Sequence, residues 1–187
     1  MRIITGSARG VTLYTLEGEN TRPTAERTKE AVFSMLQFEI EGRRVLDLFS
    51  GSGQMGLEAL SRGASFAVLL DKSKDAVRVI EKNVEKTKMK ENCRVVCGDA
   101  LDYLGRQKDS FDIVWLDPPY ASHLIPRALT LLLDGGFLKP TSVVICESGS
   151  EDVFEGDETL RGRFNVARKA KYGVAHITLL RPNIALS

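Results

Sequence analysis

The sequence predicts an α/β protein in which helices cover both faces of a largely parallel, doubly wound sheet. Apolar runs of strand length, separated by helix-like segments, occur at residues 45–49, 66–71, 93–97, 111–116 and 143–146. Continuous apolar runs that alternate with helices are typical of parallel strands buried on both faces. A glycine-rich turn follows the first run, as in doubly wound folds that bind nucleotide-like cofactors. The 187 residues suffice for one such domain and a small appendage.

The appendage is expected at the N-terminus. Two strand-like stretches, residues 2–5 and 11–14, flank a segment with glycines at both ends, which predicts a small β-hairpin. After Pro23, Thr24 is a suitable helix cap and apolar residues follow at helical spacing, so a helix is expected over residues 24–38. We therefore divide the chain into an N-terminal hairpin and helix, residues 1–40, and a main domain, residues 41–187.

The main domain contains three further predicted helices, and its last part is predicted to be antiparallel rather than parallel. Helices are expected between the strand runs, at residues 54–62, 73–86 and 123–133, and the second is amphipathic because its apolar side chains recur at helical spacing. The alternation then stops. Two strand-like stretches near residues 164–167 and 174–180 are joined through a Lys-Tyr-Gly turn, which predicts a terminal antiparallel hairpin.

The net charge of +1 hides two basic stretches. One contains Arg2 and Arg9 and no acid; the other lies near the end of the chain and contains Arg161, Arg163, Arg168, Lys169 and Lys171. Basic patches attract phosphate backbones, but they are also ordinary solvated surfaces, so charge alone leaves nucleic-acid binding open.

Several classes of protein are disfavoured. The cysteines, Cys93, Cys97 and Cys146, lie in apolar strand-like runs without Cys-x-x-Cys spacing, and the two histidines lack metal-ligand spacing. We expect buried free thiols and no metal site. No signal-like start and no apolar run of about 18 residues occur, so we expect a cytoplasmic protein that neither is secreted nor enters a membrane. Nothing in the periodicity requires a second subunit, and we expect a monomer.

The reactive motif follows the fourth apolar run and reads Asp117, Pro118, Pro119, Tyr120. Ligands of open α/β sheets bind beyond the carboxyl ends of the strands. The prolines fix the backbone and leave carbonyls as acceptors. A carboxylate and a carbonyl can accept the hydrogens of an amino group on a planar ring, and Tyr120 can stack on that ring. An ordinary Asp-Pro turn with a surface tyrosine is the alternative.

A cofactor turn is predicted after the first strand. Gly51, Gly53 and Gly56 match G-x-G-x-x-G between a strand and a helix. Asp71 ends the second strand, about 20 residues further on, where an acid can accept hydrogen bonds from ribose hydroxyls. A tight turn and a helix cap are the alternatives for these glycines and for Asp71.

Two acids favour S-adenosylmethionine over a dinucleotide. Asp47 precedes the glycine turn, where a carboxylate would repel a pyrophosphate but could bind the ammonium of a methionine group. Asp99 and Ala100 end the third strand, where a carboxylate and a backbone N–H could read the edge of adenine, unless Asp99 caps a helix. The predicted cofactor site consists of Asp47, Ser50, Gly51, Gly53, Asp71, Lys72, Asp99 and Ala100.

These motifs, in this order, resemble class I S-adenosylmethionine-dependent methyltransferases that modify exocyclic amino groups. Residues 2–10, 22–24, 56–64 and 172–173 narrow the resemblance to the RsmD family, bacterial guanine-N2 methyltransferases of 16S ribosomal RNA. The family usually has threonine and aspartate where Ala25 and Glu26 stand, arginine at Lys29 and glutamate at Asp71.

The resemblance implies a Rossmann-like seven-stranded sheet of order 3-2-1-4-5-7-6 with strand 7 antiparallel. It also implies that the substrate is one guanine, guanine 966, of 16S RNA in the small subunit or an assembly intermediate, and that no metal is needed. The predicted RNA-facing residues are Arg2, Arg9, Arg22, Thr24, Arg168, Lys169 and Lys171. Arg22 is assigned a phosphate contact or closure over the site, with an exposed helix entrance as the alternative.

The mechanistic hypothesis assigns the chemistry to residues 117–120. Asp117 accepts one hydrogen of guanine N2, the Pro118 carbonyl accepts the other, and Tyr120 stacks on an unpaired or flipped base. Two other functions remain open: an amino-methyltransferase of DNA adenine or of another RNA, and a non-catalytic RNA-binding protein on the same scaffold.

Overall fold

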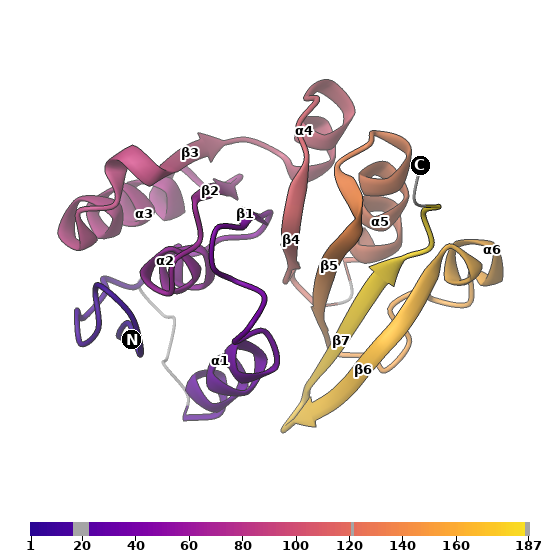
Figure 1. The fold of residues 1–187 in the computed structure, drawn as a ribbon, viewed down its shortest axis with the longest axis horizontal. Helices are drawn as coiled ribbons and strands as arrows, with labels where there is room; N and C mark the ends of the chain where they lie inside the picture. The colour runs from indigo at the N-terminus through magenta and orange to yellow at the C-terminus, as the bar shows by residue number, and fades with distance from the viewer. Residues whose placement is uncertain (17–22, 121, 186–187) are drawn as a thin grey trace.

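The computed structural model describes residues 1–16, 23–120 and 122–185. Within them lies one sheet of order β3-β2-β1-β4-β5-β7-β6 (Figure 1). Five strands are parallel: β1 (Arg44–Asp47), β2 (Phe66–Asp71), β3 (Cys93–Cys97), β4 (Phe111–Leu116) and β5 (Leu138–Ser148). Strand β7 (Ala175–Pro182) runs antiparallel to both β5 and β6 (Phe164–Tyr172). The predicted fold class and strand order are confirmed.

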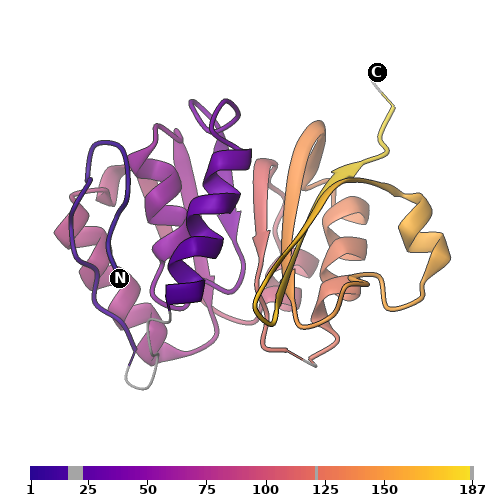
Figure 2. The same cartoon turned by 90° about the horizontal axis from the view of Figure 1, so that it is seen from below.

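Helices cover both faces of this sheet. The first face carries α1 (Pro23–Met35), α2 (Gln54–Ser61) and α3 (Lys74–Thr87), whose apolar side chains share one cluster with β1, β2, β4, β5 and β7. The second carries α4 (Ala100–Arg106), α5 (Leu124–Asp134) and α6 (Glu158–Gly162) over a separate cluster. A single 3-10 turn, Lys90–Asn92, precedes β3. In Figure 2, which views the molecule from below, α1 lies in front of the sheet.

The N-terminal segment is joined firmly to the first face. The Phe33 ring of α1 stacks on Trp115 of β4 at 5.7 Å between centroids. The carboxylate of Glu58, on α2 and fully buried, accepts hydrogen bonds from the backbone N–H groups of Ile4 and Thr5 at 2.8 and 3.1 Å. Residues before the first strand therefore contribute to the core that supports the sheet.

The predicted N-terminal hairpin is reduced to an antiparallel bridge between Arg2 and Thr12. The backbone N–H of Ile3 donates to the Val11 carbonyl at 3.0 Å, but the next two N–H groups donate to Glu58. The Glu58 carboxylate thus satisfies the backbone N–H groups of Ile4 and Thr5, and the strand pairing does not continue past Ile3.

Other boundaries differ from the predictions for local reasons. Helix α1 begins at Pro23, which is well suited to a first helical position, so Thr24 does not precede the helix as its cap. The short helices α4 and α6 were not predicted, because 7 and 5 residues give too little periodicity. The prediction of buried cysteines is wrong for Cys97, which is exposed at the end of edge strand β3, whereas Cys146 is buried.

None of the helices in the described part of the chain is long and apolar enough to cross a bilayer.

Candidate active site

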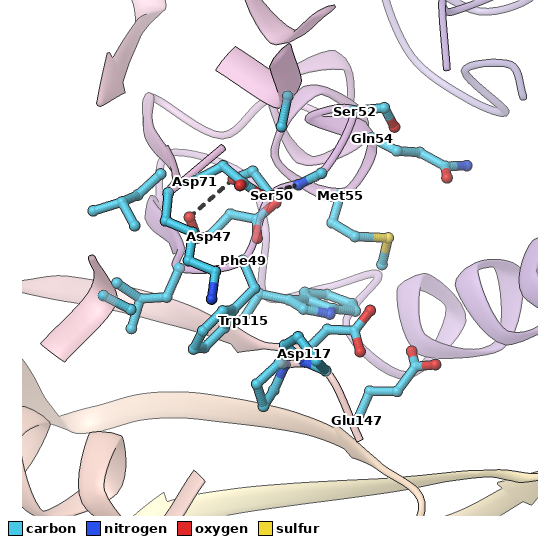
Figure 3. Close-up of a pocket in the computed structure, with 18 of the residues that line it drawn as sticks. Asp47, Phe49, Ser50, Ser52, Gln54, Met55, Asp71, Trp115, Asp117 and Glu147 are labelled. Atoms are coloured by element: carbon cyan, nitrogen blue, oxygen red, sulfur yellow. Dashed lines mark hydrogen bonds between the residues drawn. The ribbon is translucent and has the colours of Figure 1, made fainter. Parts of the chain in front are cut away.

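A cavity of about 570 Å³ opens at the carboxyl ends of the parallel strands (Figure 3). All four residues of the Asp-Pro-Pro-Tyr motif line it. So do all the predicted cofactor residues except Gly53, namely Asp47, Ser50, Gly51, Asp71, Lys72, Asp99 and Ala100. Asp47 and Tyr120, which lie 73 positions apart in sequence, therefore meet in one site, as expected for the strand ends of an open sheet.

The glycines shape the turn between β1 and α2. Gly51 and Gly53 have φ angles of 53° and 79°, which favour glycine, and Gly53 immediately precedes α2. A Cβ on Gly56 would lie 2.1 Å from Cδ2 of Leu69, so this glycine allows α2 to pack closely on β2. Gly53 does not line the cavity itself, and its positive φ and the 3.3 Å that would separate an added Cβ from Cγ2 of Ile80 both favour glycine.

Asp71 holds the same turn in place. Its Oδ2 accepts the Gly51 N–H at 2.9 Å, and its Oδ1 accepts the Ser73 N–H at 2.8 Å. The side-chain cap of α3 is Ser73 itself. Asp71 therefore connects the glycine turn to the start of α3 while also lining the cavity.

Asp47 is the most unusual group in the cavity. Its side chain is only 2% exposed, and its Oδ2 finds no hydrogen-bond donor among the described residues. Burial raises the pKa of Asp47 to about 7, although the Ser50 hydroxyl and nearby backbone amides act in the opposite direction. A buried acceptor without a donor is costly, so a cationic ligand group that reached this oxygen would be strongly favoured.

The end of β3 supplies polar groups at the other side of the cavity. Oδ1 of Asp99 accepts the N–H groups of Leu101 and Asp102 at 2.9 and 3.2 Å, so Asp99 caps α4. Both bonds use the same oxygen. Ala100 is the first residue of that helix, where N–H groups lack intrahelical acceptors, and Lys72 is exposed at the rim.

The Asp-Pro-Pro-Tyr motif extends directly from β4. Asp117 is exposed, Pro118 is buried, and Tyr120 is 47% exposed. The Tyr120 hydroxyl donates to Oε1 of Glu147 at 3.4 Å. Burial raises the pKa of Tyr120 to about 12, and the negative charges of Glu147 and Asp117 add to the shift, so both carboxylates act on this ring.

Glu147 is a cavity residue that the sequence reasoning missed. In the parallel register Leu116 lies opposite Cys146, so Asp117 and Glu147 are the next residues of adjacent strands. The signal was available, because Glu147 follows an apolar run just as Asp117 does. The family resemblance implied that the fourth and fifth strands are neighbours, but the sequence analysis did not extend this pairing to the residue that follows the fifth run.

A second cavity, of about 610 Å³, lies beside the first. The two cavities share Pro118, Pro119, Tyr120, Leu124 and Glu147. Tyr120 and Glu147 therefore border both spaces.

The predicted RNA-facing residues fall into separate groups. Arg2 is exposed, and its carbonyl accepts a hydrogen bond from Lys29, a cavity residue, at 2.8 Å. Arg9 follows residues that bond to Ser61, at the end of α2 remote from the glycine turn. Arg22 lies outside the described residues, and Thr24 lies in the first turn of α1.

The basic residues of β6 lie near the cavity level. Lys171 pairs with His176 of β7, which pairs with Ser148 at the carboxyl end of β5. In Figure 1 the β6–β7 turn lies at the lower edge of the molecule. Arg168 and Lys169 precede it on the same strand, and Lys169 forms an ion pair with Glu151 at 3.3 Å.

Within the described ranges, no three His, Cys, Asp or Glu side chains gather closely enough to hold a metal ion.

Comparisons with known proteins agree on one family. The family model described as Conserved hypothetical protein 95 matches residues 1–181. The Bacillus subtilis protein YlbH is 32% identical over 184 residues, 97% of this chain and 98% of the relative. Ribosomal RNA small subunit methyltransferase D of Haemophilus influenzae is 37% identical over 151 residues, 79% of this chain and 78% of the relative. The solved structure of the Escherichia coli protein yhhF superposes with a TM-score of 0.85, at 31% identity over 97% of both chains.

Proposed function

The chain belongs to the RsmD family of methyltransferases, and from this premise we propose that it methylates the exocyclic N2 of one guanine in 16S ribosomal RNA, using S-adenosylmethionine. One observation carries the proposal: Asp47, whose buried Oδ2 lacks a hydrogen-bond donor among the described residues, lines the same cavity as the Asp-Pro-Pro-Tyr motif. Relatives named Ribosomal RNA small subunit methyltransferase D support RNA of the small subunit as substrate. Guanine 966 is the position that the family resemblance implies.

The cavity residues fit the proposed cofactor. Oδ2 of Asp47 would accept a hydrogen from the methionine ammonium, which satisfies the buried oxygen that lacks a donor. Asp71 would accept hydrogen bonds from ribose hydroxyls. Oδ2 of Asp99, whose Oδ1 already accepts two backbone N–H groups, and the Ala100 N–H would contact the adenine edge. S-adenosylmethionine supplies an electrophilic methyl group when bound.

We assign the binding and activation of the guanine base to the Asp-Pro-Pro-Tyr motif. The N2 lone pair of guanine is delocalised into the ring, so N2 is a poor nucleophile until its hydrogens are held and the nitrogen can pyramidalise. Asp117 and the Pro118 carbonyl accept these hydrogens, and the carboxylate stabilises the positive charge that develops on N2. Tyr120 stacks on the base and contributes about 1–3 kcal/mol of binding. Much of the acceleration comes from orientation.

Transfer of a radiolabelled methyl group tests the proposal. Small-subunit particles, free 16S RNA and DNA are offered separately, and the product nucleosides are identified. We expect N2-methylguanosine in the small-subunit RNA. Label in DNA adenine would favour the broader amino-methyltransferase function, and binding without any transfer would favour a non-catalytic RNA-binding role. Loss of one modified guanine in cells without the gene would identify the target. The proposal also takes the enzyme to act in the cytoplasm as a monomer during subunit assembly.

The affinity for S-adenosylmethionine should depend on pH through Asp47. The carboxylate binds the ammonium, whereas the protonated acid does not. With a pKa of about 7 in the free protein, the ionised fraction rises from roughly one in eleven at pH 6 to one half at pH 7. The dissociation constant should therefore fall about fivefold between these values.

Calorimetry in buffers of different ionisation enthalpy checks this prediction, because close to one proton should be released per cofactor bound at pH 6. The Asp47→Asn variant should bind more weakly at pH 7 and lose the pH dependence in this range. A wild-type affinity that stays constant from pH 6 to pH 7, without proton release, would contradict the role of Asp47.

Lys171→Ala should weaken binding to small-subunit RNA by about 3- to 10-fold and lower the slope of log affinity against log salt by about 1, if Lys171 contacts a phosphate. Filter binding at several salt concentrations measures both quantities. Lys108→Ala is a matched control. Lys108 is exposed in the loop before β4, at the amino-terminal end of the parallel strands, whereas Lys171 lies level with their carboxyl ends. Equal losses for the two variants would argue against a specific surface at the β6–β7 turn.

A further inference from the structure

Glu147 stands between the two cavities, and the proposed reaction leaves it without a role. It lies at the carboxyl end of β5, beside the strand end that carries Asp117. Figure 3 shows the carboxylates of Asp117 and Glu147 on the same side of the cavity. Tyr120 and Glu147 line both cavities, so the Glu147 carboxylate borders the space that a base stacked on Tyr120 would enter.

The position of Tyr120 is fixed relative to Glu147. The Tyr120 hydroxyl bonds to Oε1, and its ring packs on the backbone of Gly149, where an added Cβ would lie 3.2 Å from ring atom Cδ2. Any side chain at position 149 would press against the ring. The Tyr120 ring and the Glu147 carboxylate are therefore held next to each other by these two contacts.

Glu147 has accepting capacity to spare. Within the described part of the chain its side chain receives one hydrogen bond, the 3.4 Å contact from Tyr120, whereas an ionised carboxylate offers about four acceptor sites. Burial raises the pKa of Glu147, so the site disfavours the charge unless further donors arrive. A ligand that brings an N–H to this carboxylate would relieve that cost.

Guanine carries such a donor. Its Watson–Crick edge presents N1–H beside the amino group N2. In the proposed function Asp117 and the Pro118 carbonyl accept the two N2 hydrogens, which leaves N1–H for a second acceptor. Resting on that proposed function, we infer that Glu147 is a specificity-determining residue that accepts the N1–H of the target guanine.

This contact also explains how purines other than guanine are rejected. Adenine carries a lone pair at N1, so a carboxylate there faces an acceptor and gains no hydrogen bond. A site built to pair a particular N–H discriminates strongly against an analogue that lacks it, because its own polar group is left unpaired. Glu147 thus supplies repulsion against the wrong base as well as attraction for the right one.

The test changes N1 while keeping the reacting amino group. Small-subunit particles are reconstituted with 16S RNA that carries either guanine or 2-aminopurine at the methylated position. The analogue retains the 2-amino group, but its N1 is an acceptor. We expect wild-type kcat/KM to be about 10- to 100-fold higher for guanine.

The Glu147→Gln variant should lower kcat/KM for guanine about 10-fold and reduce the preference over 2-aminopurine to a few-fold, because an amide can donate to N1 or accept from it. Glu158→Gln is the control, since Glu158 is exposed on α6 and pairs with Arg161. It should retain the wild-type preference.

The outcomes separate this inference from the function on which it rests. A preference for guanine that is unchanged in Glu147→Gln would overturn the role of Glu147 while leaving the methyltransferase function intact. Equal kcat/KM of the wild-type enzyme for the guanine and 2-aminopurine particles would also overturn the role of Glu147 and leave the methyltransferase function intact. Absence of methylation of the guanine particle would defeat the proposed function itself, and with it the role of Glu147.

Discussion

Replacing Asp117 with asparagine should slow methyl transfer to guanine-containing RNA by about 10²- to 10³-fold, the loss typical of removing one preorganised electrostatic contact at a reacting centre. Asparagine keeps the size of the side chain but removes the negative charge that stabilises the positive nitrogen. Cofactor affinity should change less than about threefold, because the cofactor ammonium is assigned to Asp47 and the other cofactor contacts to β2 and β3.

Single-turnover transfer from radiolabelled cofactor measures the chemical step, and calorimetry measures cofactor binding separately. Asp134→Asn serves as the control, because Asp134 ends α5 and pairs with Arg163 at 2.7 Å on the protein surface. It should turn over within about twofold of the wild type, as surface substitutions usually do. Near wild-type turnover in Asp117→Asn would remove Asp117 from the mechanism.

Most of the sheet was predictable because its strands are buried on both faces. Runs such as residues 66–71 and 111–116 are apolar except for Asp71 and Asp112, and the structure forms strands over the same residues. Their order in the sheet was not contained in this pattern. It came from the family resemblance, since neighbouring strands are chosen by packing between distant segments.

Most of the candidate site was also predictable, because functional side chains are expected where buried strands end. Residues whose role depends on which strands are neighbours were not predicted. Asp47, Asp71 and Asp117 stand at the ends of predicted strands, and all line one cavity. Glu147 has the same place on β5, but its proximity to Tyr120 depends on β5 lying beside β4. Sequence position alone could not reveal that pairing.

Charge patterning was informative only in part. The basic stretches near the two ends of the chain suggested two patches, but their positions in the fold differ. Lys171 lies level with Ser148 at the cavity edge, whereas Arg9 follows contacts to the far end of α2. A one-dimensional cluster of charges does not show which edge of the sheet it will reach.

The second large effect concerns stability and involves Glu58. This residue was part of the motif that indicated the family, yet its role is structural in the fold. Its buried carboxylate lies 3.4 Å from Nζ of Lys29 and 2.8 Å from Nε of Arg62, in addition to the two backbone N–H groups from the N-terminal segment. One acid on α2 thus binds α1 and residues 4–5 to the sheet.

Glu58→Gln should lower the free energy of unfolding by about 3–5 kcal/mol, because the buried Lys29 loses the negative charge of Glu58, which lies 3.4 Å from its Nζ. The amide oxygen of glutamine can still accept hydrogen bonds, but its NH₂ group would face the N–H donors that now bond to the second carboxylate oxygen. A change of this size lowers the melting temperature by roughly 6–20 °C in a domain of this length. Urea unfolding followed by circular dichroism gives the free energy, with Glu85→Gln on the exposed side of α3 as the control.

A double-mutant cycle with Lys29→Met separates loss of the ion pair from loss of packing. If the charges compensate each other, Lys29→Met should cost much less in Glu58→Gln than in the wild type, since the lysine charge has then already lost that carboxylate. Strictly additive losses would show that Lys29 and Glu58 act independently. The coupled result would mean that the N-terminal residues assigned to RNA are held against the methyltransferase sheet by one buried charge network, so weakening it should reduce stability and RNA binding together.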